Sequence, residues 1–170
     1  MCGIFGIVSN NEVVARLVGG LKYLEYRGYD SAGISIVGNK KLKTIKKVGK
    51  VSELEKAVAG LKGTIGIAHS RWATHGKPSE VNAHPHMSCD EIVSVVHNGI
   101  IENYKELKEE LKKLGYHFKS ETDTEVIPNL ISYYSKKEKT HKEAVQKALK
   151  KLEGAFGIAV IFADDDKHIY

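Results

Sequence analysis

The chain has 170 residues, of which 42% are hydrophobic and 28% are charged, with a formal net charge of +5. No apolar run approaches the roughly 20 residues that span a bilayer, and two cysteines are too few for a disulfide framework. We therefore expect one cytoplasmic domain without a membrane partner. The basic residues are nearly all lysines spread over predicted helix faces and turns, without a recognition-helix pattern, so we expect no nucleic-acid partner.

The first part of the chain predicts a strand, two helices and a hairpin. Residues 2–9 are an apolar run, and the leucines and valines after them recur at helical spacing. The dipeptide Gly38-Asn39 between two β-prone segments is typical of a hairpin turn. The expected elements are a strand at 2–9, a helix at 13–25, strands at 31–37 and 42–48, and a helix from 51 to Gly63.

The second part predicts three strands, three helices and the beginning of a fourth strand. Thr140 and Glu143 have the spacing of a capping box, which marks a helix start. The expected elements are a strand at 64–70, a long loop at 71–90, a strand at 91–97, helices at 104–114, 122–135 and 140–152, a strand at 155–163, and a returning strand at 167–170. Strands joined by short turns favour antiparallel sheets, so we predict an α+β layered sandwich.

Cys2 is the first candidate for chemistry. As a small apolar residue at the start of a strand it could simply be structural. However, removal of Met1 would give Cys2 a free α-amino group, and such amines titrate near ~7.7–8.0. Nucleophile and general base would then be supplied by one residue, which is the N-terminal form of an activated nucleophile.

Asn98 and Gly99 follow an apolar strand and offer an amide NH₂ and an unobstructed backbone N–H. Asn-Gly is also common in tight turns, but here it would join a strand to a helix. The pair could form an oxyanion hole for attack on an amide carbonyl. Arg71 could hold a carboxylate and Asp123 an ammonium, although Asp123 could instead cap a helix.

The histidines could suggest a metal site, but their spacing in the sequence does not favour one. His84 and His86 stand near His75 and His97, but a single His-x-His without a spaced second pair is a weak metal signal. We expect hydrogen bonds that stabilise loops instead. The prediction is therefore an enzyme that needs no metal and no cofactor.

Together these segments resemble a known family. The motifs are MCGIFGIV, LEYRGYDSAGI, GIAHSRWATHGKPSEVNAHPH, VVHNGIIENY, SETDTEVI and EGAFGIAV. They resemble the glutaminase domains of the glutamine–fructose-6-phosphate aminotransferase (glucosamine-6-phosphate synthase) family, which are class II glutamine amidotransferases among the N-terminal-nucleophile hydrolases. The resemblance implies a four-layer αββα sandwich of antiparallel sheets. It also implies hydrolysis of L-glutamine to L-glutamate and ammonia through a cysteinyl thioester.

The resemblance assigns roles to nine residues. It makes Cys2 the nucleophile, with Asn98 and Gly99 as the oxyanion hole. The residues that it implies for glutamine binding are Arg71, Thr74, His75 and Asp123. Trp72 is expected to shield the site and gate the passage of ammonia, and Arg27 to support it.

The family's usual partners extend beyond this sequence. Family enzymes add two sugar-isomerase domains that bind fructose 6-phosphate and make glucosamine 6-phosphate for amino sugar biosynthesis, and their oligomers can form through those domains. We expect residues 1–170 to be a glutaminase domain that is incomplete at its C-terminus, without these domains. The alternative hypothesis is a truncated domain that binds glutamine or a partner without turnover.

Overall fold

The computed structural model describes residues 2–72 and 77–170 of the chain. The described residues form two antiparallel sheets and five α-helices. Among them, no helix has the length and apolar character that crossing a membrane requires.

The first sheet contains strands from the N-terminal part of the chain. Its strand order is β1-β4-β2-β3, and every pair is antiparallel. The strands are β1 (Gly3–Val8), β2 (Ser31–Gly38), β3 (Lys41–Val48) and β4 (Ile65–Arg71). Two helices, α1 (Val14–Leu24) and α2 (Val51–Ala57), pack on this sheet, and a short 3₁₀ helix, η1 (Glu25–Arg27), follows α1.

The second sheet has the order β5-β6-β7, also antiparallel. Its strands are β5 (His86–Met87), β6 (Val93–Gly99) and β7 (Phe156–Phe162). The helices of this half are α3 (Tyr104–Lys113), α4 (Val126–Ser135) and α5 (His141–Leu149). The capping box predicted for α5 is present, because Thr140 and Glu143 bond each other's backbone.

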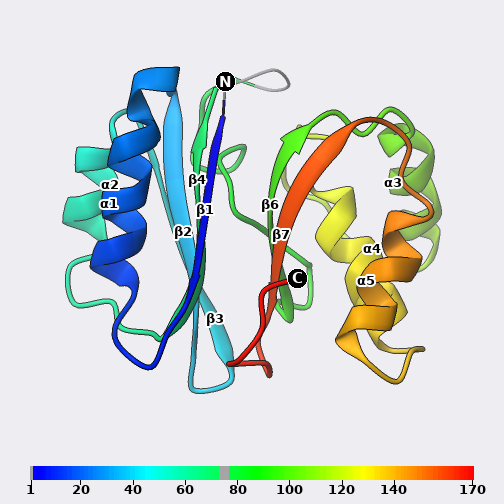
Figure 1. Cartoon of the computed structure of the whole chain (residues 1–170). Helices are drawn as coiled ribbons and strands as arrows, with labels where there is room; N and C mark the ends of the chain where they lie inside the picture. The colour runs from blue at the N-terminus through cyan, green and yellow to red at the C-terminus, as the bar shows by residue number, and fades with distance from the viewer. Residues whose placement is uncertain (1, 73–76) are drawn as a thin grey trace.

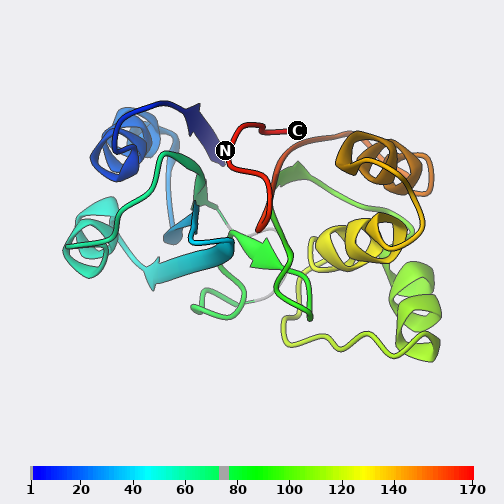
Figure 2. The ribbon, with the colours of Figure 1, turned by 90° about the horizontal axis from the view of Figure 1, so that it is seen from below.

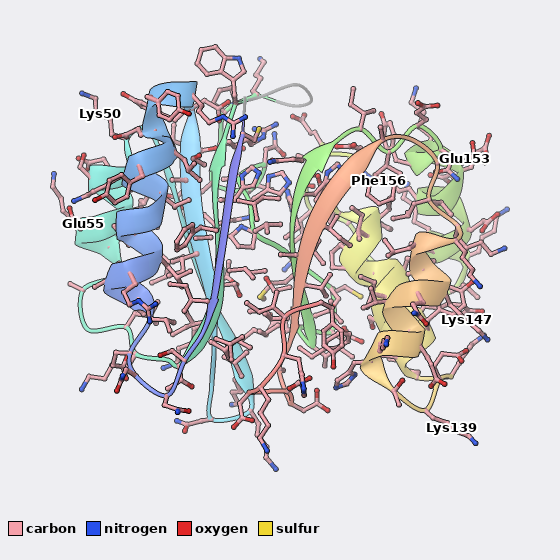
Figure 3. All side chains as sticks on the ribbon, in the orientation of Figure 1. Lys50, Glu55, Lys139, Lys147, Glu153 and Phe156 are labelled. Carbon is pink, nitrogen blue, oxygen red and sulfur yellow. The ribbon has the colours of Figure 1, made fainter. Side chains whose placement is uncertain are left out.

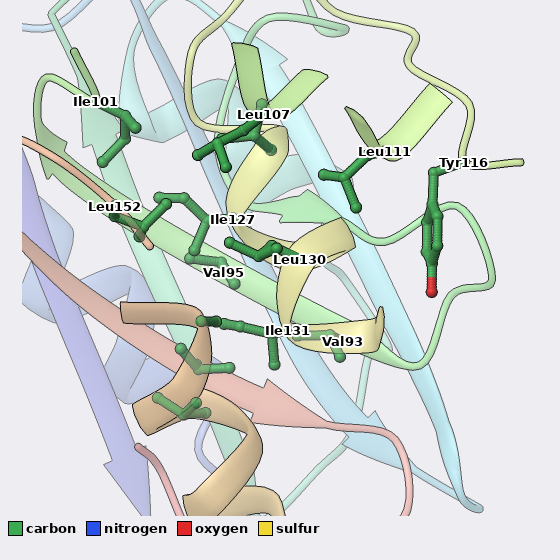
Figure 4. Close-up of a cluster of buried hydrophobic side chains, with 14 of the residues drawn as sticks. Val93, Val95, Ile101, Leu107, Leu111, Tyr116, Ile127, Leu130, Ile131 and Leu152 are labelled. Atoms are coloured by element: carbon green, nitrogen blue, oxygen red, sulfur yellow. The ribbon is translucent and has the colours of Figure 1, made fainter. Parts of the chain in front are cut away.

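The two sheets face each other, and the helices cover their outer faces, so the molecule has four layers (Figures 1 and 2). Three apolar clusters correspond to the three interfaces between these layers. One joins α1 and α2 to the first sheet, and another joins α3, α4 and α5 to β6 and β7 (Figure 4). The smallest, with Ile67 from β4 and Ile161 from β7, lies between the sheets. The predicted four-layer αββα architecture is confirmed.

Charged side chains surround these layers. Lys50, Glu55, Lys139, Lys147 and Glu153 project outward from helices and loops (Figure 3). Lysine is therefore mainly a surface residue of this fold, as the sequence predicts. The net positive charge does not require a nucleic acid to explain it.

Several predicted boundaries were wrong by a few residues. The hairpin turn lies at Asn39 and Lys40, whose positive φ angles of 53° and 55° suit a two-residue turn. The helix predicted to extend to Gly63 ends at Ala57, and the helix predicted from position 122 begins at Val126. Residues 167–170 form no strand, although Tyr170 exchanges two backbone hydrogen bonds with Val160.

The strand register brings the chemically interesting segments to one end of the sandwich. Because β1 and β4 are antiparallel, Gly3 pairs with Ser70, and the start of β1 lies beside the end of β4. Ser31, the first residue of β2, pairs with Arg71. In the facing sheet, β6 ends at Gly99. Four segments that are far apart in sequence therefore converge.

Candidate active site

A cavity of about 570 Å³ opens where these segments converge. Seven of the nine predicted site residues line it, namely Cys2, Arg27, Arg71, Trp72, Asn98, Gly99 and Asp123. Its other lining residues are His84, His97, Ile100, Thr122 and Thr124. The volume lies in the range of small-molecule sites. Met1, Thr74 and His75 lie outside the described residues, so their predicted parts stay predictions.

The Cys2 sulfur is held by the backbone of Trp72. The Trp72 N–H donates to Sγ over 3.2 Å, and Sγ lies 3.5 Å from the Trp72 carbonyl oxygen. The half-buried thiol thus faces the cavity from a fixed position, held by two contacts with the backbone of one residue.

The Trp72 side chain rests against Gly28. Trp72 is 54% exposed, and a Cβ added to Gly28 would come within 2.2 Å of the indole ring. Gly28 also has a φ of +95°, a conformation that other residues rarely adopt. The glycine after Arg27 therefore permits both the turn and the close approach of the indole.

Asn98 and Gly99 end β6 rather than forming a hairpin turn. The Asn98 Nδ2 group donates to the Cys2 carbonyl oxygen over 3.3 Å, which places the amide beside the candidate nucleophile. Gly99 has a φ of +131°, and a Cβ there would lie 2.4 Å from the Ala155 carbonyl oxygen. Only glycine fits this position, and Gly99 lines the same cavity as Cys2.

Asp123 does not cap a helix. Its side chain is 4% exposed, and Oδ2 accepts a hydrogen bond from the Ile101 N–H over 2.8 Å. This bond ties Asp123 to the segment that follows Asn98 and Gly99. A carboxylate held against the cavity wall can bind an ammonium group.

Arg71 ends β4 with its side chain buried. Its Nη1 atom lies 3.9 Å from Asp30 Oδ1, and the Asp30 N–H donates to the Arg71 carbonyl oxygen over 2.7 Å. Ser31 Oγ donates to the same Asp30 oxygen over 2.7 Å. Asp30 and Ser31 thus support the guanidinium at the cavity, where it can meet a carboxylate.

A group of buried histidines lies at the cavity, of which His84 and His97 line it and His69 and His86 do not. His84 Nε2 and His97 Nδ1 both lie within 3.0 Å of Thr124 Oγ1, and His86 Nε2 lies 3.1 Å from Thr122 Oγ1. The expected hydrogen-bonding role of these three histidines is confirmed. His69, in β4, was not predicted, and its sequence signal is a polar residue inside an otherwise buried strand.

Comparisons with known proteins agree with this architecture. Residues 69–170 match the glutamine amidotransferase domain family. The chain is 56% identical over 166 residues to glutamine–fructose-6-phosphate aminotransferase (isomerizing) of Pseudomonas putida, covering 96% of this chain and 27% of that protein. Its identity to the protein of the same name from Pyrobaculum aerophilum is 50% over 179 residues, covering 100% of this chain and 29% of that protein.

The fold is also similar to that of a solved amidotransferase. Glutamine phosphoribosylpyrophosphate amidotransferase from B. subtilis matches with a TM-score of 0.80 and 28% identity, covering 96% of this chain and 35% of that one. This chain therefore spans less than a third of the two aminotransferases and about a third of the solved protein.

Proposed function

The chain belongs to the glutamine amidotransferase domain family, and from this premise we propose that it hydrolyses L-glutamine to L-glutamate and ammonia with Cys2 as nucleophile. It is homologous to the glutamine-hydrolysing part of glutamine–fructose-6-phosphate aminotransferases. The observation that carries the proposed mechanism is the hydrogen bond from the Asn98 amide to Cys2, beside the thiol held by Trp72.

The first half of the reaction forms a thioester. The Cys2 α-amine, free once Met1 is removed, accepts the thiol proton, and sulfur attacks the side-chain amide carbon of glutamine. The carbonyl oxygen becomes an oxyanion that accepts hydrogen bonds from Asn98 Nδ2 and the Gly99 N–H. When the C–N bond breaks, the protonated amine gives its proton to the leaving nitrogen, and ammonia departs.

The second half releases glutamate. Water gives a proton to the Cys2 amine and attacks the γ-glutamyl thioester, and the same oxyanion hole holds the second tetrahedral intermediate. Collapse of this intermediate breaks the C–S bond, and the amine returns its proton to sulfur. Each residue thus ends in its initial state, and one water is consumed for each ammonia released.

The α-carboxylate and the α-ammonium group of glutamine lie on the same carbon, at the end of the substrate opposite the amide. We propose that Arg71 binds the α-carboxylate and Asp123 the α-ammonium, and that Thr74 and His75 also contribute to glutamine binding. This pair of charges selects a zwitterionic amino acid and leaves the amide end for Cys2. Trp72 and Arg27 line the same cavity, and we propose that they shield the reaction from bulk water.

The use of the ammonia is a further part of the proposal. The curated relatives are named for transfer to fructose 6-phosphate, and they are several times longer than this chain. We propose that this domain supplies ammonia to sugar-isomerase domains that bind fructose 6-phosphate in the cytoplasm. The glutaminase steps proposed above use residues of this chain only.

Ammonia release from glutamine by the purified chain tests this function. Mass spectrometry first establishes that Met1 has been removed, because the proposed base exists only then. We expect turnover by the parent chain and loss of at least a thousandfold with Cys2→Ala, as for other removed nucleophiles. An equal rate in the Cys2→Ala variant would overturn the proposal.

A further inference from the structure

His69 lies behind the candidate oxyanion hole rather than in the cavity. It comes from β4, is fully buried, and reaches across to the end of β6 in the facing sheet. Its Nε2 atom is 2.8 Å from Asn98 Oδ1 and 3.1 Å from the His97 carbonyl oxygen. Asn98 is therefore in contact with Cys2 on one side and with His69 on the other.

These contacts fix the proton on His69 and the orientation of the Asn98 amide. The His97 carbonyl can only accept a hydrogen bond, so the nearby His69 Nε2 must carry a hydrogen. The Asn98 atom beside that N–H must then be the oxygen. It follows that the Asn98 NH₂ group points the other way, to the Cys2 carbonyl oxygen.

The His69 ring is itself held in place. His84 stacks on it with ring centroids 4.3 Å apart, and Thr124 Oγ1 binds His84 over 3.0 Å. Burial lowers the pKa of His69 to about 4, so the ring stays neutral at neutral pH. A neutral, stacked imidazole with its hydrogen on Nε2 presents that N–H to Asn98.

We propose that His69 is a positioning residue that keeps the Asn98 NH₂ group turned toward Cys2 for stabilisation of the oxyanion. The inference rests on the proposed glutaminase function. A reversed Asn98 amide would present its oxygen to the oxyanion, and the two negative ends would repel. His69 prevents this reversal because a turned NH₂ group would meet its N–H, donor against donor.

Two substitutions of similar size distinguish the effect of the His69 N–H donor from the effect of side-chain packing. His69→Gln keeps an N–H donor near the position of Nε2, whereas His69→Met keeps the length and loses the donor. Loss of one oxyanion donor typically lowers kcat by about 10²–10³-fold. We expect His69→Met to lower kcat by about 10–100-fold with KM within threefold, and His69→Gln to retain kcat within threefold.

The double substitution tests whether His69 acts through Asn98. In the Asn98→Ala background, His69→Met should lower kcat by less than twofold, because no amide remains to be oriented. A further tenfold loss in that background would overturn the proposal. If thermal melting shows that His69→Met does not fold, His69→Gln becomes the test. A His69→Gln variant with a native melting curve and a kcat lowered more than tenfold would also overturn the proposal.

His86→Gln is the matched control, since His86 is buried in the same histidine group but bonds Thr122 and not Asn98. It should keep kcat within threefold of the parent. An inactive parent chain with Met1 removed would count against the glutaminase function itself. An active parent that is slowed by Asn98→Ala but not by His69→Met would overturn the positioning role alone.

Discussion

The Cys2 sulfur lies 3.2 Å from the backbone nitrogen of Trp72, 70 residues further along the chain. Antiparallel pairing of β1 with β4 makes this contact, because the start of one strand lies beside the end of the other. The donor belongs to the backbone, so any side chain at position 72 could supply it. What tryptophan adds is the indole that covers Gly28.

Gly28→Ala tests how far the indole position matters. The added methyl group would lie within 2.2 Å of the indole and displace it, while the φ of +95° adds about 1 kcal/mol of backbone strain. We expect kcat/KM for glutamine to fall by roughly tenfold, since Trp72 lines the cavity and is proposed to shield the reaction from bulk water. Steady-state glutaminase kinetics provide the measurement.

Gly49→Ala is the control for strain. Gly49 has a similar φ of +98°, and a Cβ there would meet nothing within 4 Å. Both variants should lose a similar free energy of unfolding, but only Gly28→Ala should lose activity. Equal activity in the two variants would show that the contact between Gly28 and the indole is irrelevant to catalysis.

Asp123→Asn tests recognition of the substrate's ammonium group. The amide keeps an oxygen for the Ile101 N–H, so the local fold should persist, but the negative charge is lost. We expect KM for glutamine to rise about 10–100-fold, because the substitution removes a charge-assisted hydrogen bond that contributes about 1.5–3 kcal/mol to binding. The melting temperature should hardly change. An unaltered KM would exclude Asp123 from substrate binding.

The buried histidines should weaken the fold in mild acid. Burial lowers the pKa of His69 to about 4 and the pKa values of His84 and His86 well below 6.5. The unfolded chain takes up protons near pH 6.5 at these positions, whereas the folded chain does not. Stability is therefore complete above that pH and falls below it, by up to about 1.4 kcal/mol per pH unit for each histidine.

Denaturant titrations at pH 7, 6 and 5 measure this dependence. We expect the midpoint to fall steadily from pH 6.5 to pH 5, and His86→Gln to reduce the slope because it removes one titrating group. The acid denaturation of ordinary carboxylates begins at lower pH, where they become protonated. A constant free energy of unfolding between pH 7 and pH 5 would contradict this account of the histidines.

The strands and the candidate site residues were largely predictable because their signals are local. Apolar runs and glycines mark β1, β6 and β7, and the Asn98-Gly99 pair stands out at the end of its strand. Helix ends were harder to predict. The segment before α4 carries Asp123 and Glu125, and it is not helical. The carboxylates of these two residues accept hydrogen bonds from the backbone N–H groups of Ile101 and Ser120.

The position of His69 in an apolar strand is visible in the sequence, but its role is not, because that role depends on a contact with the facing sheet. Nothing within β4 indicates that its Nε2 reaches Asn98, which comes 29 residues later on another sheet. The same holds for Thr124, which binds His84 and His97. Residues that position a ligand-facing group without facing the ligand themselves can be recognised only from the three-dimensional packing of the layers.

The two cysteines provide the most direct test of Cys2 as nucleophile. A glutamine analogue carrying a diazoketone in place of its amide should modify Cys2 and leave Cys89, which is free and exposed, unmodified. Excess glutamine should protect Cys2, and peptide mass spectrometry reads both sites in one sample. A general alkylating agent, in contrast, should modify Cys89. Labelling of Cys89 by the analogue, or labelling of Cys2 that glutamine does not prevent, would contradict the central claim.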